Sequence, residues 1–486
     1  MSLKQAGINA SKWSSTATIL ITLIQLIQLG VLSRLLTATD YGLMGIVTVI
    51  VGFAQIYTDA GISNAIMHHK DMEQRQLSSL YYLNVASGII VLFLVVILSP
   101  LIAGFYSEPG LIEPLIWISL VFAVIPIGQQ FQILFQKELE FNKLAIFDIT
   151  ATITGFIVAV ISAIAGSGVL ALVWGQLTNS SVKSLLLFLF GIRRWPLLAH
   201  FKFNETRKFL SFGFYQMAEK TVHFISTNLP NIIIGRFFGI EALGYYTFAF
   251  QIIIIPIQKI VPIFTQISLP LFAKVHEDQE RLKRGYLKVM QFLGLINFPI
   301  YLGLIVVSPE FIPIVFGQKW IDSTPIVQIL CGMGLLRSTI SPISSLFIAK
   351  GRADLSFRWT CITMIFIIPG IVIGGIINGV IGIAIGYLLA QCFLVILNYL
   401  YSIRKLLGPC LKDYFTSFMN PFILSLIMAA LVFVLQIFVN EADYLSLASQ
   451  VFIGVISYCA INFLLNRDVV LEVVSAVFKK SQKVAL

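Results

Sequence analysis

Long apolar runs follow one another along nearly the whole chain, with short polar segments between them. A membrane-spanning helix needs about 20 predominantly apolar residues, and these runs have that length. The pattern therefore predicts an all-α polytopic membrane protein with about 14 transmembrane helices. The predicted spans are 13–36, 41–66, 78–103, 114–135, 144–166, 168–191, 209–237, 244–271, 286–308, 324–348, 358–378, 380–402, 416–439 and 446–465.

Basic residues are distributed unevenly over the segments between these spans. If both termini are cytoplasmic, most of the 33 Lys and Arg residues fall in inner loops and tails. The outer loops then hold eight Asp or Glu residues and a single basic residue, Lys319. This is the positive-inside pattern, and it predicts an even number of spans with both ends in the cytoplasm.

Composition supports the membrane interpretation and removes other partners. Hydrophobic residues make up 58% of the 486 residues and charged residues 12%, whereas a soluble domain carries roughly 25% charged residues. Because the net charge of +10 is explained by the inner loops, no nucleic-acid partner is expected. The five cysteines show no disulfide or zinc spacing. The first apolar run lacks a cleavage site and predicts a retained span.

Two stretches of the chain resemble each other. In "LSRLLTATDYGLMGI" a glycine follows an arginine by eight residues, from Arg34 to Gly42, and "IGRFFGIEALGYYTF" repeats this from Arg236 to Gly244. Six predicted spans separate the copies, so both have the same orientation, as in a parallel internal repeat. Chance similarity of two hydrophobic corners is the alternative.

The repeat predicts an N-terminal lobe of helices 1–6 at residues 1–200 and a C-terminal lobe of helices 7–12 at 201–408. The remainder, residues 409–486, would hold helices 13–14 and a cytoplasmic amphipathic tail. That tail has valines on one side of a helix between residues 470 and 477, followed by lysines, which is typical of a helix on the inner leaflet.

Motifs for chemistry are absent from the sequence. It contains no P-loop, no His-Glu-x-x-His and no Gly-x-Ser-x-Gly pattern. No cofactor or metal is expected. The outer loops are also too short for an extracytoplasmic catalytic domain, so the sequence predicts transport rather than catalysis.

Charged residues inside the predicted spans are the informative set, because charge in a bilayer is costly and usually faces a cavity. Lys220, Lys259 and Arg337 lie about 16–18 Å from the cytoplasmic ends of their spans, at 1.5 Å per residue. His223 and Thr227 follow Lys220 at i+3 and i+7, on one helix face. Such cations suit an anionic cargo such as a phosphate. Helix-linking ion pairs or packing are the alternative roles.

Other charges within spans are further candidates. Arg34 and Arg236 lie at outer helix ends, where they either face the mouth of a cavity or extend to headgroups. Asp59 and Glu219 are candidates for ion coupling, with pairing or capping as the alternative. Lys183 is expected to extend to the membrane surface.

The corner and the end of the second span resemble a known family. The residues are Tyr41-Gly42, Phe53, the segment 59–65, "QLSSLYYLNV" at 76–85 and "GRFFGIEALGYYTFA" at 235–249. Together they are similar to Wzx-type polysaccharide exporters, in the lipopolysaccharide and colanic-acid-like branch of the multidrug/oligosaccharidyl-lipid/polysaccharide exporter superfamily. The resemblance covers the first twelve spans in layout.

The resemblance implies two six-helix lobes, a central cavity lined largely by spans 1, 2, 7 and 8, and two additional C-terminal helices. It implies a flippase that moves a polyprenyl-pyrophosphate-linked oligosaccharide across the bacterial inner membrane, with a polysaccharide polymerase and chain-length proteins as possible partners. Many relatives carry an acidic residue near position 231, where this chain has Asn231, so the ion-coupling site is open.

Three other functions compete with this interpretation. A drug/cation antiporter of the same superfamily would favour about twelve spans and acidic cavities. A membrane polysaccharide polymerase or ligase would need larger outer loops. A non-enzymatic scaffold would leave the charges within the spans without a role.

Overall fold

The computed structural model describes residues 3–59, 66–67, 72–438 and 443–465, and the described residues form helices and turns with no β-strand among them. Helices are the expected solution in lipid, because each span must satisfy its own backbone N–H and C=O groups. The predicted all-α architecture is confirmed. The amphipathic tail predicted after residue 465 lies outside the described residues.

The chain folds into two compact units, Met1–Phe248 and Ala249–Leu486. The division falls within helix α9 (Ile240–Lys274), which contributes its first residues to the first unit. The predicted three-part organisation, with boundaries after residues 200 and 408, stays a prediction.

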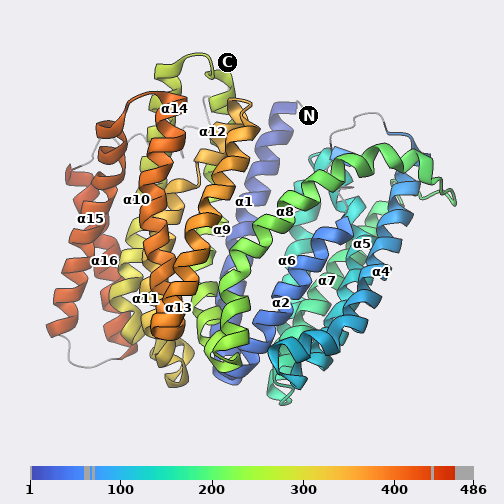
Figure 1. Ribbon diagram of the computed structural model, residues 1–486, viewed down its shortest axis with the longest axis horizontal. Coiled ribbons are helices and arrows are strands. Elements are labelled where there is room, and N and C mark those ends of the chain that lie inside the picture. Colours follow the sequence, from blue (N-terminus) through green and yellow to red (C-terminus); the bar gives the residue numbers. More distant parts are fainter. Residues whose placement is uncertain (1–2, 60–65, 68–71, 439–442, 466–486) are drawn as a thin grey trace. The chain divides into compact units, whose positions relative to one another are not determined.

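The first unit contains seven long helices and the start of α9 in its described residues. They are α1 (Leu3–Leu35), α2 (Ala38–Asp59), α4 (Gln74–Tyr106), α5 (Ile112–Lys137), α6 (Phe141–Ile164), α7 (Val169–Ile192) and α8 (Phe203–Phe237), with a 3₁₀ turn at Pro109–Leu111. Helix α6 packs against α1 and α7, and α8 packs against α2 and α4 (Figure 1).

Small residues allow the helices of the first unit to approach closely. A Cβ on Gly155 in α6 would lie 2.7 Å from the carbonyl oxygen of Gly175 in α7, and a Cβ on Gly175 would lie 2.7 Å from Ala159 Cβ. Similarly, a Cβ on Gly128 in α5 would lie 2.7 Å from the Cα of Ser184 in α7. Small residues at the contacts are typical of membrane helix packing.

The second unit contains the remainder of α9 and the C-terminal helices. They are α10 (Gln279–Phe311), α11 (Thr324–Ile340), α12 (Ile343–Ala349), α13 (Ala353–Leu397), α14 (Arg404–Leu407), α15 (Leu411–Phe438) and α16 (Tyr444–Leu465). Short π-helical segments occupy Ile312–Phe316 and Asn398–Ile403, and a 3₁₀ segment occupies Gln318–Ser323.

Helix α13 is a pair of helices joined by a tight break. Asn378 and Gly379 leave the helical region, with φ 55° at Gly379, a left-handed value that favours glycine. The two halves then pack closely, because a Cβ on Gly374 would lie 2.0 Å from the carbonyl oxygen of Gly382. This break coincides with the predicted turn between spans 358–378 and 380–402.

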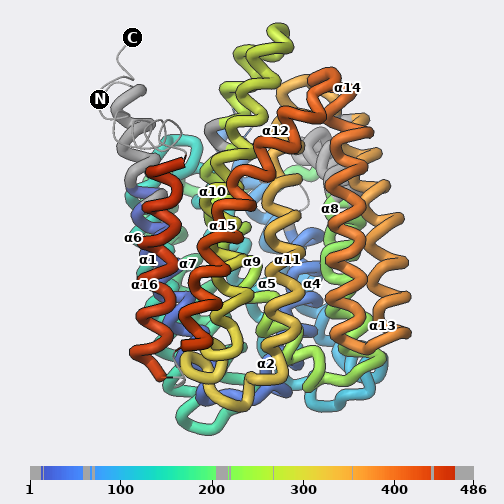
Figure 2. Tube along the Cα trace, turned by 90° about the vertical axis from the view of Figure 1, so that its left-hand side faces the viewer, coloured from blue at the N-terminus to red at the C-terminus, as the bar shows by residue number. Residues whose placement is uncertain are grey.

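The last two helices attach to α10. Figures 1 and 2 both show α15 beside α16, and both helices contact α10. Near the end of α10, the carboxylate of Glu310 accepts hydrogen bonds of 2.7 Å from Gln436 Nε2 in α15 and from Gln450 Nε2 in α16. One acidic residue therefore links three helices.

Eleven helical segments of the described chain are long and apolar enough to cross a membrane. One of them, Asp354–Leu407, contains both halves of α13. Helices α7 and α8, which lie at predicted spans, are not among the eleven; polar residues such as Asn179 and Lys183 in α7 lower its hydropathy. A multi-pass membrane protein is thus supported, and the count of fourteen spans stays a prediction.

Candidate functional site

The two copies of the repeated corner contact each other. Gly42 lies at the start of α2 and Gly244 at the start of α9. A Cβ on Gly42 would lie 2.0 Å from the carbonyl oxygen of Ile240, and a Cβ on Gly244 would lie 1.8 Å from that of Ala38. Positions 38 and 240, like 42 and 244, are related by the same offset of 202 residues. The two helix starts therefore cross with local two-fold pseudosymmetry.

Further contacts continue this crossing along both helices. A Cβ on Gly45 would lie 2.7 Å from Thr247 Oγ1. The rings of Tyr41 and Phe248 meet edge to face, with centroids 6.0 Å apart. These residues are buried, so the crossing is a packed contact within the first unit.

The arginine before each corner is exposed at the end of a helix. Arg34 lies in the last turn of α1 and Arg236 in the last turn of α8. Arg236 Nη1 donates to Ser107 Oγ over 3.1 Å, and its guanidinium carbon lies 5.4 Å from the centroid of the Phe105 ring. Arg236 is thus held at the end of α4. The direction of the two arginines relative to a central cavity stays a prediction.

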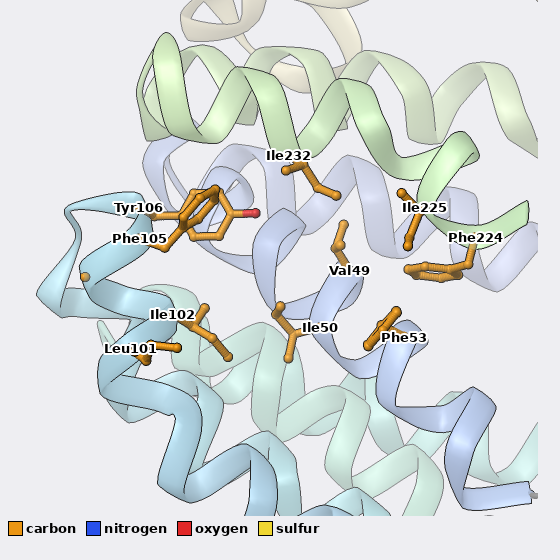
Figure 3. A pocket seen from close by; sticks show the side chains of 11 residues that line it. Val49, Ile50, Phe53, Leu101, Ile102, Phe105, Tyr106, Phe224, Ile225 and Ile232 are labelled. Atoms are coloured by element: carbon orange, nitrogen blue, oxygen red, sulfur yellow. The ribbon is translucent and has the colours of Figure 1, made fainter. Parts of the chain in front are cut away.

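An apolar groove of about 740 Å³ lies among α2, α4 and α8, and its lining includes Phe105, whose ring Arg236 contacts. Figure 3 shows side chains of the three helices around it. Carbon atoms dominate its lining, so the groove suits a hydrocarbon chain rather than a sugar. The lining residues are Val49, Ile50, Phe53, Leu101, Ile102, Gly104, Phe105, Tyr106, Phe224, Ile225 and Ile232.

The two ends of the groove differ in polarity from its middle. At one end lie Phe105 and Tyr106 (Figure 3), which complete α4, and Arg236 contacts Phe105 and the following Ser107. At the other end, the Phe53 ring lies 6.3 Å from that of Phe224. One turn beyond them, the hydroxyls of Tyr57 and Thr221 are 3.2 Å apart. The apolar stretch therefore runs between a cationic end and a hydroxyl pair.

The candidate cargo-binding residues of α8 are exposed at the surface of the first unit. Lys220 and His223 are both exposed, one turn apart, and Thr227 Oγ1 donates to the backbone carbonyl of His223 over 2.9 Å. The side chains of Asp59 and Glu219 lie outside the described residues. Cargo binding by Lys220 and His223 stays a prediction. Ion coupling by Asp59 and Glu219 stays a prediction as well.

The predicted cations of the second unit have different surroundings. Lys259 is half-buried in α9 between Pro256 and Pro262. Arg337 in α11 is also half-buried, and its Nη1 donates to Tyr387 Oη in α13 over 3.4 Å. Arg337 therefore links two helices of this unit. A cargo-binding role for Lys259 and Arg337 stays a prediction.

An ion pair between α6 and α7 was missed by the sequence analysis. Lys183 Nζ lies 2.8 Å from Asp148 Oδ1, with side-chain exposures of 29% and 35%. Lys183 was expected to extend to the membrane surface, and the structure gives it a carboxylate on the neighbouring helix instead. Asp148, the fifth residue of the predicted span 144–166, was the available signal.

Charged residues also join the loops of the first unit on the predicted inner side. Arg194 pairs with Glu138 and Glu140, and Lys143 Nζ lies 2.8 Å from Glu140 Oε2. Although burial raises it, hydrogen bonds from Lys143 and Arg194 hold the pKa of Glu140 below its ordinary value. The segment that follows Arg194 is attached to α4, because the backbone N–H of Leu198 donates to Ser78 Oγ over 2.9 Å. No group of three potential metal ligands occurs in the described residues.

The chain is similar to known proteins of one family. A family described as "Polysaccharide biosynthesis protein" matches residues 31–325. The lipopolysaccharide biosynthesis protein WzxC of Escherichia coli K12 is 39% identical over 426 residues, 88% of this chain and 87% of WzxC. The teichuronic acid biosynthesis protein TuaB of Bacillus subtilis strain 168 is 34% identical over 436 residues, 89% of either chain.

Solved structures share the fold at low sequence identity. The lipid II flippase MurJ in an inward closed conformation superposes with a TM-score of 0.74 at 16% identity, over 95% of this chain and 100% of that one. An inward-facing multidrug transporter of the MATE family gives a TM-score of 0.59 at 16% identity, over 79% and 94%. These likenesses concern the fold.

Proposed function

We propose that this chain, which belongs to the family of polysaccharide biosynthesis proteins as a Wzx-type exporter, moves a polyprenyl-pyrophosphate-linked oligosaccharide from the inner to the outer leaflet. The membrane is the bacterial cytoplasmic membrane, and both termini are cytoplasmic. The cargo is moved unchanged, for the synthesis of O-antigen, capsule or exopolysaccharide.

The groove beside Arg236 is the observation that carries this proposal. It combines an apolar groove along three helices with a guanidinium that contacts Phe105 at one end. A lipid-linked sugar has the matching parts, namely a hydrocarbon tail, a pyrophosphate and a polar head. Arginine suits the pyrophosphate because its planar fork donates to two oxygens at once.

The remaining cations would serve the same cargo by alternating access. Lys220 and His223 on α8 would neutralise the pyrophosphate within the first unit, and Lys259 on α9 would do so within the second unit. Three prolines in the same helices, Pro230, Pro256 and Pro262, remove backbone hydrogen bonds and make bending there inexpensive. Bending would transfer the site from one side to the other.

Antiport of a drug or cation is the second function to test, because the MATE transporter shares the fold. The exposed Lys220 and Arg236 disfavour it, since cations on the cavity-lining helices repel a cationic cargo. A polysaccharide polymerase and chain-length proteins are proposed as partners that use the flipped units.

Deletion of the gene in its host tests the proposal. We expect surface polysaccharide to be lost while lipid-linked repeat units accumulate on the inner leaflet, protected from enzymes added outside. Accumulation of single units on the outer leaflet would instead indicate a polymerase. Unchanged surface polysaccharide would contradict the proposal.

A further inference from the structure

The groove and Arg236 lie at the predicted outer end of the membrane. Helix α4 ends at Tyr106 and α8 at Phe237, both next to predicted outer loops. Ile232 and Leu101 line the groove about one turn from these ends, and Phe53 and Phe224 line it about 20 Å deep at 1.5 Å per residue. On the predicted topology, the apolar groove therefore spans the outer leaflet, with Arg236 beside its outer end.

Arg236 retains donors for an anion. Its described contacts are the Ser107 hydroxyl and the Phe105 ring, and no carboxylate of the described residues forms an ion pair with it. A guanidinium has five N–H donors, of which the serine takes one. Because the serine and the phenylalanine ring fix its position, the guanidinium is arranged in advance for a phosphate.

We infer that Arg236 and this groove hold the lipid product after translocation, with the pyrophosphate at Arg236 and the first isoprenoid units along α2, α4 and α8. This inference rests on the proposed function and adds an outer-leaflet product site within the first unit. It is separate from Lys220, which lies 16 residues before Arg236 on the same helix, about 24 Å at 1.5 Å per residue.

The lining and the charge favour this occupant over other membrane molecules. Sugar hydroxyls would lose their hydrogen bonds among carbon side chains, so the oligosaccharide stays outside the groove. The cation at the surface end matches the pyrophosphate and is not needed for a neutral polyprenol.

Retention of the product at this place has a consequence for the transport cycle. A pyrophosphate bound at Arg236 is no longer in contact with Lys220, so α8 can return to its inward-open arrangement without the cargo. The site would thus favour completion of the cycle over return of the cargo.

Photocrosslinking of the full chain in vesicles tests the site. The probe is a polyprenyl pyrophosphate with a photoreactive group on an isoprenoid unit near the head. We expect crosslinks to peptides of α2, α4 and α8 around the groove. A polyprenol with the same photoreactive group should label these peptides about tenfold less, the loss expected for a charge-assisted contact.

Two pairs of variants identify the parts of the site. Arg236→Gln should reduce labelling by the pyrophosphate about tenfold, to that of the polyprenol, and Arg236→Lys should restore part of it. Leu101→Trp fills the groove and should prevent labelling. Ile97→Trp is the matched control, because Ile97 is one turn away on α4, equally exposed (73% against 72%) and outside the groove.

Labelling that is unchanged in Arg236→Gln and Leu101→Trp would overturn the inference. So would crosslinks outside α2, α4 and α8. A third contradicting result would be that phosphatidylglycerol competes with the probe for labelling as well as unlabelled polyprenyl pyrophosphate does. Arg236→Lys keeps the test valid if Arg236→Gln fails to fold. Transport by the wild type is measured separately. If the wild type flips cargo and the variants label normally, only the product site fails; if it does not flip cargo, the proposed function fails.

Discussion

Gly42 and Gly244 each face the carbonyl oxygen of the first residue of the other glycine's helix. A Cβ on Gly42 would lie 2.0 Å from the oxygen of Ile240, and one on Gly244 would lie 1.8 Å from that of Ala38. Neither oxygen can move without its backbone. The chain repeats this corner because the two copies pack against each other and both need glycine.

Alanine at either glycine should therefore destabilise the first unit. We expect Gly42→Ala and Gly244→Ala each to cost about 1–3 kcal/mol through overpacking, measured as a lower thermal unfolding midpoint in detergent. Gly110→Ala is the control, because a Cβ there would contact nothing within 4 Å. Midpoints equal to the control's would show that the corners do not pack as described.

The membrane ion pair between Asp148 and Lys183 gives a second prediction. Asp148→Asn leaves the ammonium without its partner, and because the pair is partly exposed we expect a loss of about 1 kcal/mol. The exchange Asp148→Lys with Lys183→Asp should recover most of this loss. A double-mutant cycle of unfolding midpoints measures the coupling, and additive single effects would mean that the pair contributes nothing.

The inner-side cluster around Glu140 predicts a dependence on pH. Because the pKa of Glu140 is lowered in the folded state, the ionised carboxylate stabilises the fold above its ordinary pKa of 4.5. This stabilisation is lost as the pH falls from 4.5 through the lowered folded value. The wild type should unfold at higher temperature than Glu140→Gln at pH 7, and the difference should vanish at low pH. A constant difference from pH 7 to pH 3 would contradict this origin.

The lysines of α8 and α9 give a prediction about transport. We expect Lys220→Ala and Lys259→Ala each to reduce surface polysaccharide about tenfold at equal protein levels, since each removes a charge-assisted contact to pyrophosphate. Lys412→Ala is the matched control and should leave export unchanged, because Lys412 is exposed and lies outside the predicted spans. Full export by both variants and by the double variant would exclude the two lysines from the cargo site.

Local signals in the sequence were sufficient for much of the fold. The length of the apolar runs predicts the helices, and the residues Asn378 and Gly379 mark the break within α13. The offset between Gly42 and Gly244 reveals the repeat. These features depend on residues that are close in sequence or on a repeated pattern, so a sequence is enough to find them.

Features that depend on the rotation of one helix against another were not predicted. Lys183 could equally extend to the surface or pair with Asp148, and only the packing of α6 on α7 decides this. The groove was missed for a similar reason, since Leu101 and Ile225 are apolar residues like those that face lipid elsewhere. Apolar side chains carry no sequence signal for the surface they line.

Flipping by the purified protein tests the central claim most directly. The protein is reconstituted in vesicles with a polyprenyl-pyrophosphate-linked oligosaccharide whose sugar is fluorescent, and a reagent outside the vesicles quenches the sugars that it can reach. We expect vesicles with the wild type to expose sugars that stay protected in protein-free vesicles, and those with Lys220→Ala to do so more slowly. Equal protection in vesicles with and without the protein would contradict the account.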